Sequence, residues 1–574
     1  MTEGSLFDLA ALRKIGGLVA GDLLAVDPAL YSKFEAHQAK SVKDDATTRN
    51  LVFLTGLSAY TQEPINVFLR GESSLGKTYI TVNVLGTFPK EDVWFLGGLS
   101  PKALVYDKGT LIDKNGDIIL PVDKPGKDAD AEEKEAYHAY RERMKDSRYL
   151  IVMSGKILVF LDAPNFDTFN VLRPILSHDC YETSFKSVDK QNGRLRTIHV
   201  IIRGWPACIF CSTVEKFVQD LATRSFTFTP QNTPEKIAKA NLLTGTKASF
   251  PWKFEHDKDA LLLEGYVRFF KDKMVDLKAV LPLADKFAEA FPSKVPRSMR
   301  DFKHLLGLIQ VRALFHFAQR PVLTRKIKVA ATNSPGLESG SEGALHDRGE
   351  KEETYVLAVK EDYDAILELW KDIREATETS AGAHILTFFN EVVLKAPHET
   401  LDQSLTVKGL TDLWNETKSS HKSSDTIRDW VDFLCQIGYM TKEPNPQDKR
   451  ENLLKIIKNE ENGKCTENDL SAFFTLENFK AWLKEAQQIT EESKPALRKN
   501  ILTDTETTPD ELFTEYFPSD SLHSAVIYQS EMRDAFPETS LEKADNEKTV
   551  QYPNISEEPD TRMNGQRQKV GDNP

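Results

Sequence analysis

The sequence predicts an α/β protein with a helical region, a small second domain and an acidic tail, and three observations support this prediction. Short apolar runs alternate with helical segments between residues 46 and 235, which is the pattern of a parallel sheet covered by helices. A glycine-rich segment, GESSLGKT at residues 71–78, follows one of these runs directly. Residues 501–560 hold 15 Asp and Glu against 3 Lys and Arg and little apolar periodicity, which predicts a disordered tail.

Length and composition limit the possible classes of protein. A chain of 574 residues is long enough for about two to four domains. It contains no apolar stretch of the ~18 residues that a membrane span needs, and its start lacks the pattern of a signal peptide. Five cysteines in so long a chain make no disulfide framework. We therefore expect a cytoplasmic protein that does not bind a membrane.

Cys208 and Cys211 have a spacing that is also found in metal sites. They lie in PACIFCST, an apolar run that predicts a buried strand. Strand residues three apart face opposite sides of a sheet, so the two thiols cannot readily share one metal ion. We therefore interpret both cysteines as structural.

The formal net charge of −13 does not exclude a nucleic-acid partner. Residues 501–560 alone contribute −12, the difference between 3 basic and 15 acidic residues. The rest of the chain therefore carries only −1, that is −13 minus −12. Local basic patches can dominate the field there.

The segment at 71–78 matches G-x-x-x-x-G-K-[ST] in full, with the apolar run INVFLR before it and a helical pattern after it. This context predicts a phosphate-binding loop for ATP and Mg²⁺. We expect Lys77 to meet the β- and γ-phosphates and Thr78 to bind Mg²⁺. The glycines let backbone N–H groups turn toward the phosphates at the start of a helix. The predicted ATP-binding loop residues are Gly71, Glu72, Ser73, Ser74, Leu75, Gly76, Lys77 and Thr78.

Two further segments carry polar residues in a pattern that suggests chemistry. KILVFLD ends a near-continuous apolar run at Asp162, as a central parallel strand with a metal-binding carboxylate does. Between residues 181 and 203, two strand-like segments flank Asn192-Gly193, which predicts a tight hairpin turn. The hairpin is basic at Lys186, Lys190, Arg194 and Arg196.

Over roughly residues 50–450 the order of these motifs resembles the AAA+ P-loop ATPases, in particular helicases of the minichromosome-maintenance type and related plasmid or viral replication ATPases. The resemblance implies a ring, typically a hexamer, that moves single-stranded DNA. It implies that the hairpin with Lys186, Lys190, Arg194 and Arg196 contacts DNA phosphates. A solvated surface hairpin is the alternative.

The resemblance also implies roles for residues after the hairpin. Ser212 or Thr213 takes the sensor-1 place beside the γ-phosphate. Arg224, in LATRSFTFTP, takes the place of the arginine finger that reaches a neighbouring subunit's nucleotide. Arg300 takes the sensor-2 place at the start of a lid helix, with Arg297 in reserve. An ordinary surface arginine is the alternative in each case.

One departure from the family concerns turnover. In most AAA+ motors a glutamate follows the strand-end Asp and polarises the attacking water, whereas Ala163 follows Asp162 here. Asn165, Asp167 or Asp179 supplies that role, or hydrolysis is slow. The catalytic residues we predict are Lys77, Asp162 and Arg224, with Thr78 and Asp162 as the metal ligands.

The domain boundaries follow from these patterns. Residues 383–455 have the order of a winged helix, with a first helix, a short strand at SLTV (404–407), two further helices and a wing, and such a module binds either DNA or a protein. The expected function is an ATP-dependent DNA helicase of the replicative type. The alternatives are a nucleotide-switched DNA-binding initiator or loader, and a protein-remodelling ATPase that binds no DNA.

We predict an N-terminal helical segment at 1–45, an AAA+ α/β core at 46–235, a helical lid region at 236–380, a winged-helix-like domain at 381–490 and an acidic disordered tail at 491–574.

Overall fold

The computed structural model places most of the chain as far as residue 517, in one compact unit, while residues 518–574 form a second unit that is not described. Among the described residues, no helix is both long enough and apolar enough to cross a membrane. The described residues are 21, 24–98, 109–126, 130–162, 164, 166–191, 194–212, 224–254, 257–291, 297–328, 350–379, 383–395, 406–418, 420–436, 439–444, 452–456, 473–488, 496–501 and 506–517.

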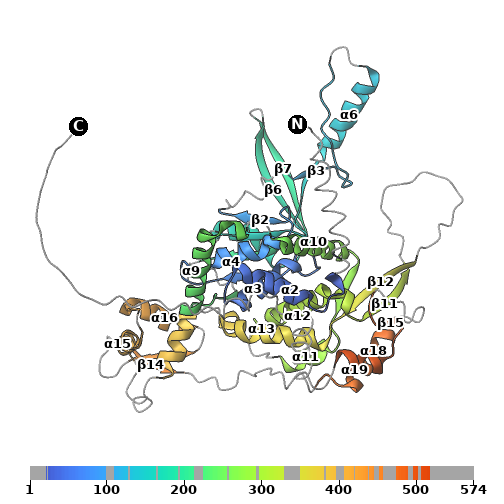
Figure 1. Cartoon of the computed structure of the whole chain (residues 1–574). Helices are drawn as coiled ribbons and strands as arrows, with labels where there is room; N and C mark the ends of the chain where they lie inside the picture. Colours follow the sequence, from blue (N-terminus) through green and yellow to red (C-terminus); the bar gives the residue numbers. More distant parts are fainter. Residues whose placement is uncertain are drawn as a thin grey trace, which may run out of the picture. The chain divides into compact units, whose positions relative to one another are not determined.

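A five-stranded parallel sheet lies at the centre of the first unit (Figure 1). Its order is β2-β5-β8-β1-β9, and each neighbouring pair is parallel. The apolar runs predict this arrangement, because strands buried on both faces lack the apolar–polar alternation of half-exposed strands. The mixed α/β fold with a parallel sheet is therefore confirmed. The strands are β1 (Asn66–Leu69), β2 (Val93–Leu96), β5 (Ile157–Phe160), β8 (Ala207–Cys211) and β9 (Phe226–Phe228).

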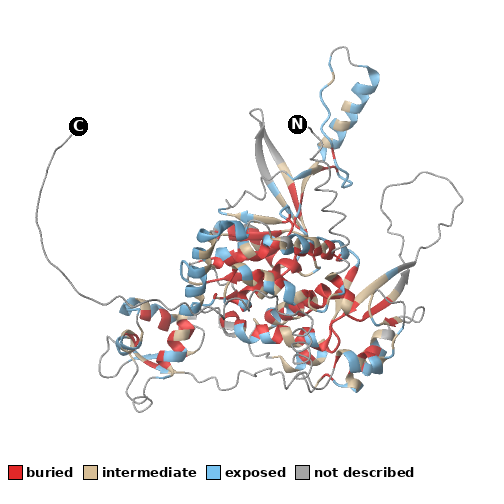
Figure 2. Cartoon of the chain, viewed as in Figure 1, coloured by how far each residue is buried: buried red, intermediate tan, exposed pale blue. Residues whose placement is uncertain are grey.

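Alternate residues of the sheet enter two different cores. Val67 and Leu69 pack into the large core on one face, whereas Phe68 packs into a smaller core on the other. Helices cover the first face, and α7 with a second sheet covers the other. Figure 2 shows the buried residues concentrated in this region. The helices and 3₁₀ turns around the large core are α2 (Leu30–Ser41), α3 (Ala46–Ser58), α4 (Lys77–Val84), η1 (Leu85–Thr87), α10 (Lys258–Lys273), α11 (Ala284–Ala290), α12 (Ser298–Phe315), η3 (Phe317–Gln319) and α13 (Lys360–Thr379), and α7 spans Phe166–Leu176.

The two cysteines of β8 lie on opposite faces of the sheet, as the strand geometry predicts. Cys208 belongs to the smaller core and Cys211 to the large one. Burial raises the pKa of both thiols. Within the described part of the chain, no group of three or more His, Cys, Asp or Glu side chains lies close enough to hold a metal ion.

A second, four-stranded sheet has the order β3-β4-β7-β6. β6 and β7 form the predicted antiparallel hairpin, from the pair Glu182 and Arg203 to the pair Gln191 and Arg194, while Asn192 and Gly193 lie outside the described residues. Of the charged segment at 123–149, residues 131–145 are helical, and the chain then enters a strand that pairs with β7. The elements are β3 (Thr110–Ile112), the exposed helix α6 (Ala131–Lys145), β4 (Arg148–Val152), β6 (Glu182–Gln191) and β7 (Arg194–Arg203).

The region at 236–380 is not purely helical, which corrects the prediction of a helical lid. After helix α9 (Pro234–Ser249) and turn η2 (Pro251–Phe254), it contributes three strands to a third sheet of order β10-β12-β11-β15. The pairing joins residues far apart in sequence, so local periodicity does not reveal it. The strands are β10 (Leu277–Val280), β11 (Val322–Lys328), β12 (Glu350–Leu357) and β15 (Ala496–Arg498).

A small core of its own holds residues 383–456 together, around Phe388, Trp414 and Trp430. The prediction of a strand at SLTV (404–407) is wrong for Val407, because this residue begins a helix. Residues 401–405 lie outside the described residues. The predicted boundary at 490 is also wrong, because Phe479 of α18 (Leu476–Gln488) packs into the large core. The elements of the small unit are α14 (Ala383–Thr387), the π-helical turn η4 (Phe388–Val393), α15 (Val407–Thr417), α16 (Ser424–Gln436), β13 (Met440–Pro444) and β14 (Asn452–Ile456).

The predicted tail at 491–574 begins too early. β15 pairs with β11, and α19 (Pro509–Tyr516) starts with a capping box between Thr508 and Glu511. Leu512 and Phe517 are buried in the large core. Residues 496–517 therefore belong to the folded unit despite their acidic composition.

This boundary gives a first prediction. Removal of residues 518–574 leaves the midpoint of urea unfolding unchanged, since the folded unit ends at Phe517. Removal of residues 496–574 lowers the free energy of unfolding by on the order of 3 kcal/mol or more, because each large apolar side chain lost from a core costs ~2–5 kcal/mol. Equal stability of the two truncated chains would contradict the assignment of 496–517 to the core.

Candidate functional site

The segment at 71–78 forms a tight loop between β1 and α4. Gly71, Ser74 and Gly76 have φ angles of 129°, 72° and 82°. A Cβ atom on Gly71 would lie 2.6 Å from Leu75 Cδ1 and 3.0 Å from Thr229 Cγ2, so a larger residue does not fit. The left-handed turns direct the loop back over the amino end of α4. Backbone N–H groups at a helix start favour an anionic ligand.

Lys77, the first residue of α4, folds its side chain into this loop. Its ammonium Nζ donates hydrogen bonds to the Gly71 carbonyl at 2.9 Å and the Glu72 carbonyl at 2.7 Å. The side chain is buried, and burial lowers the pKa of the Lys77 ammonium. The loop thus holds a cation at its centre, close to the start of α4. Phosphate oxygens are the group that this arrangement fits.

The register of the sheet places the carboxyl ends of β1, β5 and β8 at the same level, and we call the residues that follow them the row of strand ends. Leu69 pairs with Cys211, and Phe160 pairs with Phe210, which itself pairs with Phe68. Since all the strands are parallel, Arg70, Ser212 and Asp162 follow at the same level of the same edge. The Ser212 N–H donates to the Leu69 carbonyl at 3.0 Å, and the Arg70 N–H donates to the Phe228 carbonyl at 2.8 Å.

Thr78 is exposed at this edge, near the Cys211 thiol. The same thiol lies 3.6 Å from the Thr81 hydroxyl. Asp162 is exposed as well. The row therefore offers a hydroxyl and a carboxylate beside the loop, which are oxygen donors of the kind that Mg²⁺ prefers. Thr213, Ala163 and Asn165 lie outside the described residues.

Arg224 and Arg300 lie together at the opposite edge of the sheet. Both line a cavity of about 70 Å³ next to Pro64 and Ile65, which precede β1. Arg224 likewise precedes β9, and its carbonyl accepts a hydrogen bond of 3.3 Å from the Asn66 side chain. Since β1 has four residues, a length of ~13 Å separates this edge from the loop. Within one chain, neither arginine therefore lies beside Lys77.

The reserve residue Arg297 has a structural contact in this region. Its Nε donates to both Asp301 carboxylate oxygens, at 3.2 and 3.0 Å, and its Nη2 donates to the Ser225 carbonyl at 3.2 Å. Both side chains of the pair are nearly buried. These bonds fix the start of α12 to the segment before β9.

The basic hairpin extends beyond its neighbouring strand. β4 pairs with β7 only from Val200 to Arg203, so the rest of β7 pairs with β6 alone. This free part is ~20 Å long at about 3.4 Å per residue. Lys186 is exposed and pairs with His199. Lys190, Arg194 and Arg196 have described backbones in the strands, but their side chains lie outside the described residues.

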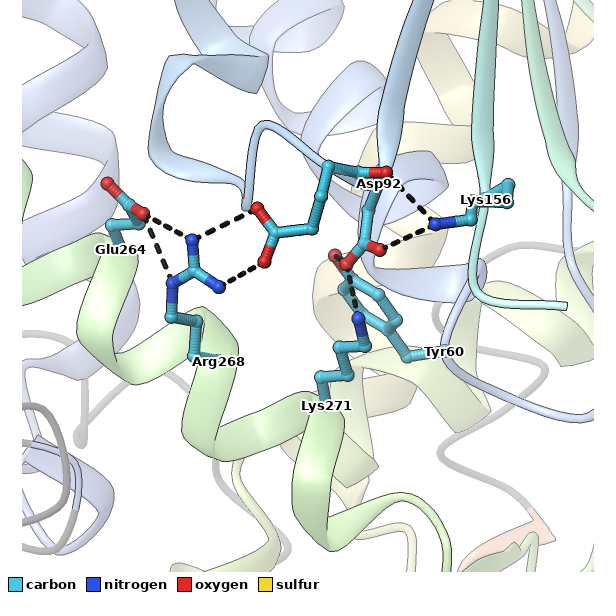
Figure 3. Close-up of polar contacts among 7 residues, drawn as sticks. Tyr60, Asp92, Lys156, Glu264, Arg268 and Lys271 are labelled. Atoms are coloured by element: carbon cyan, nitrogen blue, oxygen red, sulfur yellow. Dashed lines mark hydrogen bonds and ion pairs between the residues drawn. The ribbon is translucent and has the colours of Figure 1, made fainter. Parts of the chain in front are cut away.

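A cluster of ion pairs ties α10 to the amino edge of the sheet (Figure 3). The buried Asp92 carboxylate is bonded to Lys271 at 2.6 Å, to Lys156 at 3.2 Å and to the Tyr60 hydroxyl at 3.0 Å. Beside it, Arg268 bonds Glu91 and holds the pKa of that carboxyl at about 2. Every charge of this cluster faces an opposite charge, so we interpret it as a structural clamp. Sequence reasoning missed it because its members come from four separate segments.

Two histidines of the cavity were also missed by sequence reasoning. His304 is half-buried on α12, and its partial burial lowers its pKa to about 3. His178 follows α7, and burial lowers its pKa to about 4. Neither residue lies in a recognisable motif, and only the fold brings them together beside Arg300.

Neither a known protein family nor a curated protein matches the chain.

The two histidines predict how stability depends on pH. Their folded-state pKa values, about 3 and 4, lie below the ordinary value of 6.5. The unfolded chain therefore binds protons more readily, so stability is complete above pH 6.5 and is lost as the pH falls toward 3. At pH 5, the lowered pKa of His304 alone reduces the free energy of unfolding by about 2 kcal/mol, because each pH unit below 6.5 costs ~1.4 kcal/mol.

Urea unfolding at pH 7, 6 and 5 measures this effect. His304→Gln makes the pH dependence shallower, whereas the exposed His138→Gln in α6 leaves it unchanged. An identical pH dependence in all three proteins would show that His304 does not titrate in this way.

Proposed function

We propose that the chain is an ATP-dependent DNA motor of the AAA+ P-loop type, resembling helicases of the minichromosome-maintenance and plasmid or viral replication kind. One observation carries the proposal. The loop GESSLGKT lies between a buried parallel strand and a helix, with Lys77 inside it and with Ser212 and Asp162 in the same row of strand ends. Ligands of parallel sheets bind at this carboxyl edge, where the strand order reverses.

The residues of this edge fit ATP and Mg²⁺. Lys77 and the N–H groups of residues 71–78 bind the phosphates, and Thr78 with Asp162 holds the metal ion. Bound Mg²⁺ neutralises charge that develops on the transferring phosphoryl group. Ser212 lies beside the loop, where it can hydrogen-bond the terminal phosphate, and Thr213 follows it.

The position of Arg224 and Arg300 supports catalysis between subunits. Both belong to the edge of the sheet away from the chain's own loop, so each acts on nucleotide held by a neighbouring copy. Arg224 is the arginine finger of this proposal, and Arg300 is the sensor-2 arginine. This arrangement requires a homo-oligomer. In a closed ring such as a hexamer, every loop meets the two arginines of a neighbouring copy.

Exposed apolar side chains beside the loop support an interface there. Leu242 of α9 is 71% exposed and Trp252 of η2 is 63% exposed. Lys247 lies between the rings of Tyr79, on α4, and Phe254, 5.9 and 5.6 Å from their centres. Exposed apolar groups gathered in this way are typical of protein interfaces. A second copy is the partner that the proposed catalysis requires.

DNA binding is supported by the free hairpin arm and, more weakly, by the unit at 383–456. This unit has the order of helices and the β13–β14 hairpin of a winged helix. Several of its basic side chains are already paired, Lys442 with Asp432 and Arg428 with Asp425. The hairpin with Lys186, Lys190, Arg194 and Arg196 is therefore the main DNA contact of the proposal.

A second function is favoured by the residue after Asp162. Ala163 cannot polarise an attacking water, so slow hydrolysis would suit an initiator or loader that uses ATP as a switch. A protein-remodelling ATPase that binds no DNA is the outcome if the hairpin proves to have no role in binding DNA.

Lys77→Ala is the central test. The substitution removes the cation inside the loop, so we expect ATP affinity or turnover to fall at least about a hundredfold while circular dichroism stays unchanged. The exposed Lys90→Ala is the matched control and keeps full activity. Unchanged ATP affinity and turnover in a folded Lys77→Ala protein would remove the proposal.

Mixed subunits test catalysis across the interface. Lys77→Ala and Arg224→Ala chains are each inactive alone, but a mixture regains part of the ATPase rate, because an intact loop meets an intact arginine at some interfaces. Native mass spectrometry with ATP reports the oligomer. A strictly monomeric chain with full activity is incompatible with this arrangement.

The double variant Lys190→Ala/Arg194→Ala tests the DNA contact. Single-stranded DNA binding weakens, and its salt dependence becomes shallower by up to about two charges per subunit. The DNA-free ATPase rate is retained, because β6 and β7 belong to the second sheet and not to the sheet whose strand ends surround the loop. Lys134→Ala/Arg141→Ala in the exposed helix α6 is the control. Equal DNA affinity and salt dependence in both double variants would favour the DNA-free remodelling ATPase.

A further inference from the structure

The base of the β6–β7 hairpin (Figure 1) carries two aromatic side chains, Tyr181 just before β6 and Trp205 just after β7. Tyr181 is 54% exposed and Trp205 is half-buried. Their rings meet edge to face, with 5.4 Å between ring centres and 87° between ring planes. Such a contact covers at most one face of a ring, so the Tyr181 ring stays open to solvent at the foot of the hairpin.

Backbone and side-chain contacts fix the position of Tyr181. Its carbonyl accepts a hydrogen bond of 2.7 Å from the Gly204 N–H, which extends the pairing of the hairpin by one step. Its hydroxyl lies 3.2 Å from the Ser154 hydroxyl, at hydrogen-bond distance. Gly204 has a φ of 83°, and a Cβ atom on it would lie 1.9 Å from Ser154 Oγ, so this close approach needs glycine. A ring held in this way loses little conformational freedom when a ligand stacks on it.

Trp205 supports the Tyr181 ring from the protein side. Its indole N–H donates to the Cys180 carbonyl at 3.0 Å. The His178 ring stacks on the indole, with 5.1 Å between ring centres and 28° between planes. His178 therefore occupies one face of Trp205, while Tyr181 meets the same indole edge to face. Of the two aromatic residues at the hairpin base, Tyr181 is the one that a ligand in solution can reach.

The charges of the hairpin indicate which ligand comes to this ring. Residues 182–203 hold five Lys and Arg against two Asp and Glu, a net charge of +3 with His neutral. Glu182, at the base, forms an ion pair of 3.0 Å with Arg203. The exposed Lys186 lies five positions beyond Tyr181, or ~17 Å along the strand. The exposed Asp179 is near in sequence, but it does not repel an uncharged base. Single-stranded nucleic acid combines phosphates for the hairpin with flat rings for Tyr181.

We propose that Tyr181 is a stacking site for a base of single-stranded DNA, and that Trp205 and Ser154 hold its ring in position. The inference rests on the DNA-binding part of the proposed function. It adds a contact with a base, whereas the charged residues of the hairpin contact phosphates. Stacking accepts any base, because every base has a π-face. The contact therefore suits a protein that moves along DNA without reading its sequence.

Binding of single-stranded oligothymidine to the full chain, measured by fluorescence anisotropy over a range of salt concentrations, separates the two kinds of contact. Tyr181→Ala weakens binding about tenfold or more, the effect of losing one stacked base. The salt dependence stays unchanged, because no phosphate contact is lost. Tyr181→Phe keeps the ring and therefore an affinity within about twofold of the unaltered chain. Tyr137→Ala, in the exposed helix α6, is the matched control and changes neither quantity.

A strand in which abasic sites replace the thymidines tests the same contact without altering the protein. We expect the unaltered chain to bind this strand about tenfold or more weakly than oligothymidine, with the same salt dependence. Tyr181→Ala, in contrast, discriminates much less between the two strands. Because the unaltered chain is used, this comparison decides the question even if Tyr181→Ala fails to fold: equal affinity for both strands would contradict stacking.

Equal affinity of Tyr181→Ala and the unaltered chain for oligothymidine would also overturn the proposal. Weaker binding by Lys190→Ala/Arg194→Ala in the same assay would then leave the phosphate contact of the hairpin in place. If the unaltered chain bound no single-stranded DNA, the stacking site and the DNA-binding function would fail together. A change of oligomer in native mass spectrometry with Tyr181→Ala, at unchanged DNA affinity, would overturn stacking and assign Tyr181 to a contact between protein chains.

Discussion

β1 pairs with a strand on each side and is buried on both faces. This placement fixes the positions of two polar sites, the loop at 71–78 after the strand and the cavity before it. At its amino end, the buried Asn66 side chain donates to the Leu176 and Arg224 carbonyls at 3.2 and 3.3 Å, and accepts from the Cys208 N–H at 3.2 Å. At its carboxyl end, the chain turns at once into the loop that holds Lys77. Because a buried amide without partners is costly, Asn66 keeps the amino end in register. The sheet therefore separates a loop suited to phosphate from a second basic pocket by the length of one short strand.

How far the sequence predicts this arrangement depends on how local each signal is. The loop at 71–78 needs only the spacing of Gly71, Gly76 and Lys77, and the hairpin needs only Asn192-Gly193 between two strand patterns. Both predictions rest on a few consecutive residues, and the backbone described around each agrees with them. The Cys208 and Cys211 geometry follows from strand alternation alone.

The features that sequence reasoning missed all depend on distant pairing. β11 pairs with β12 and with β15, and no periodicity within one segment reveals such a sheet. Residues 496–517 have a composition typical of a tail, because polar and charged residues outnumber apolar ones, although Leu512 and Phe517 reach the large core. The cavity has the same origin, since Glu63, His178 and His304 come from three regions. Burial then shifts the histidine pKa values, which composition cannot show.

Helix α7 joins the two edges of the sheet physically. It begins at Phe166, shortly after Asp162, and ends at Leu176 beside Asn66. His178 follows with a φ of 56°, stacked on Trp205 at the base of the hairpin, while the Trp205 indole donates to the Cys180 carbonyl at 3.0 Å. A helix is stiff along its axis, so a displacement at its start, next to Asp162, would reach the cavity and the hairpin base together. Coupling of this kind needs two arrangements of one packed element, and His178, whose left-handed φ is costly for a residue other than glycine, is the residue that leads from α7 toward the hairpin.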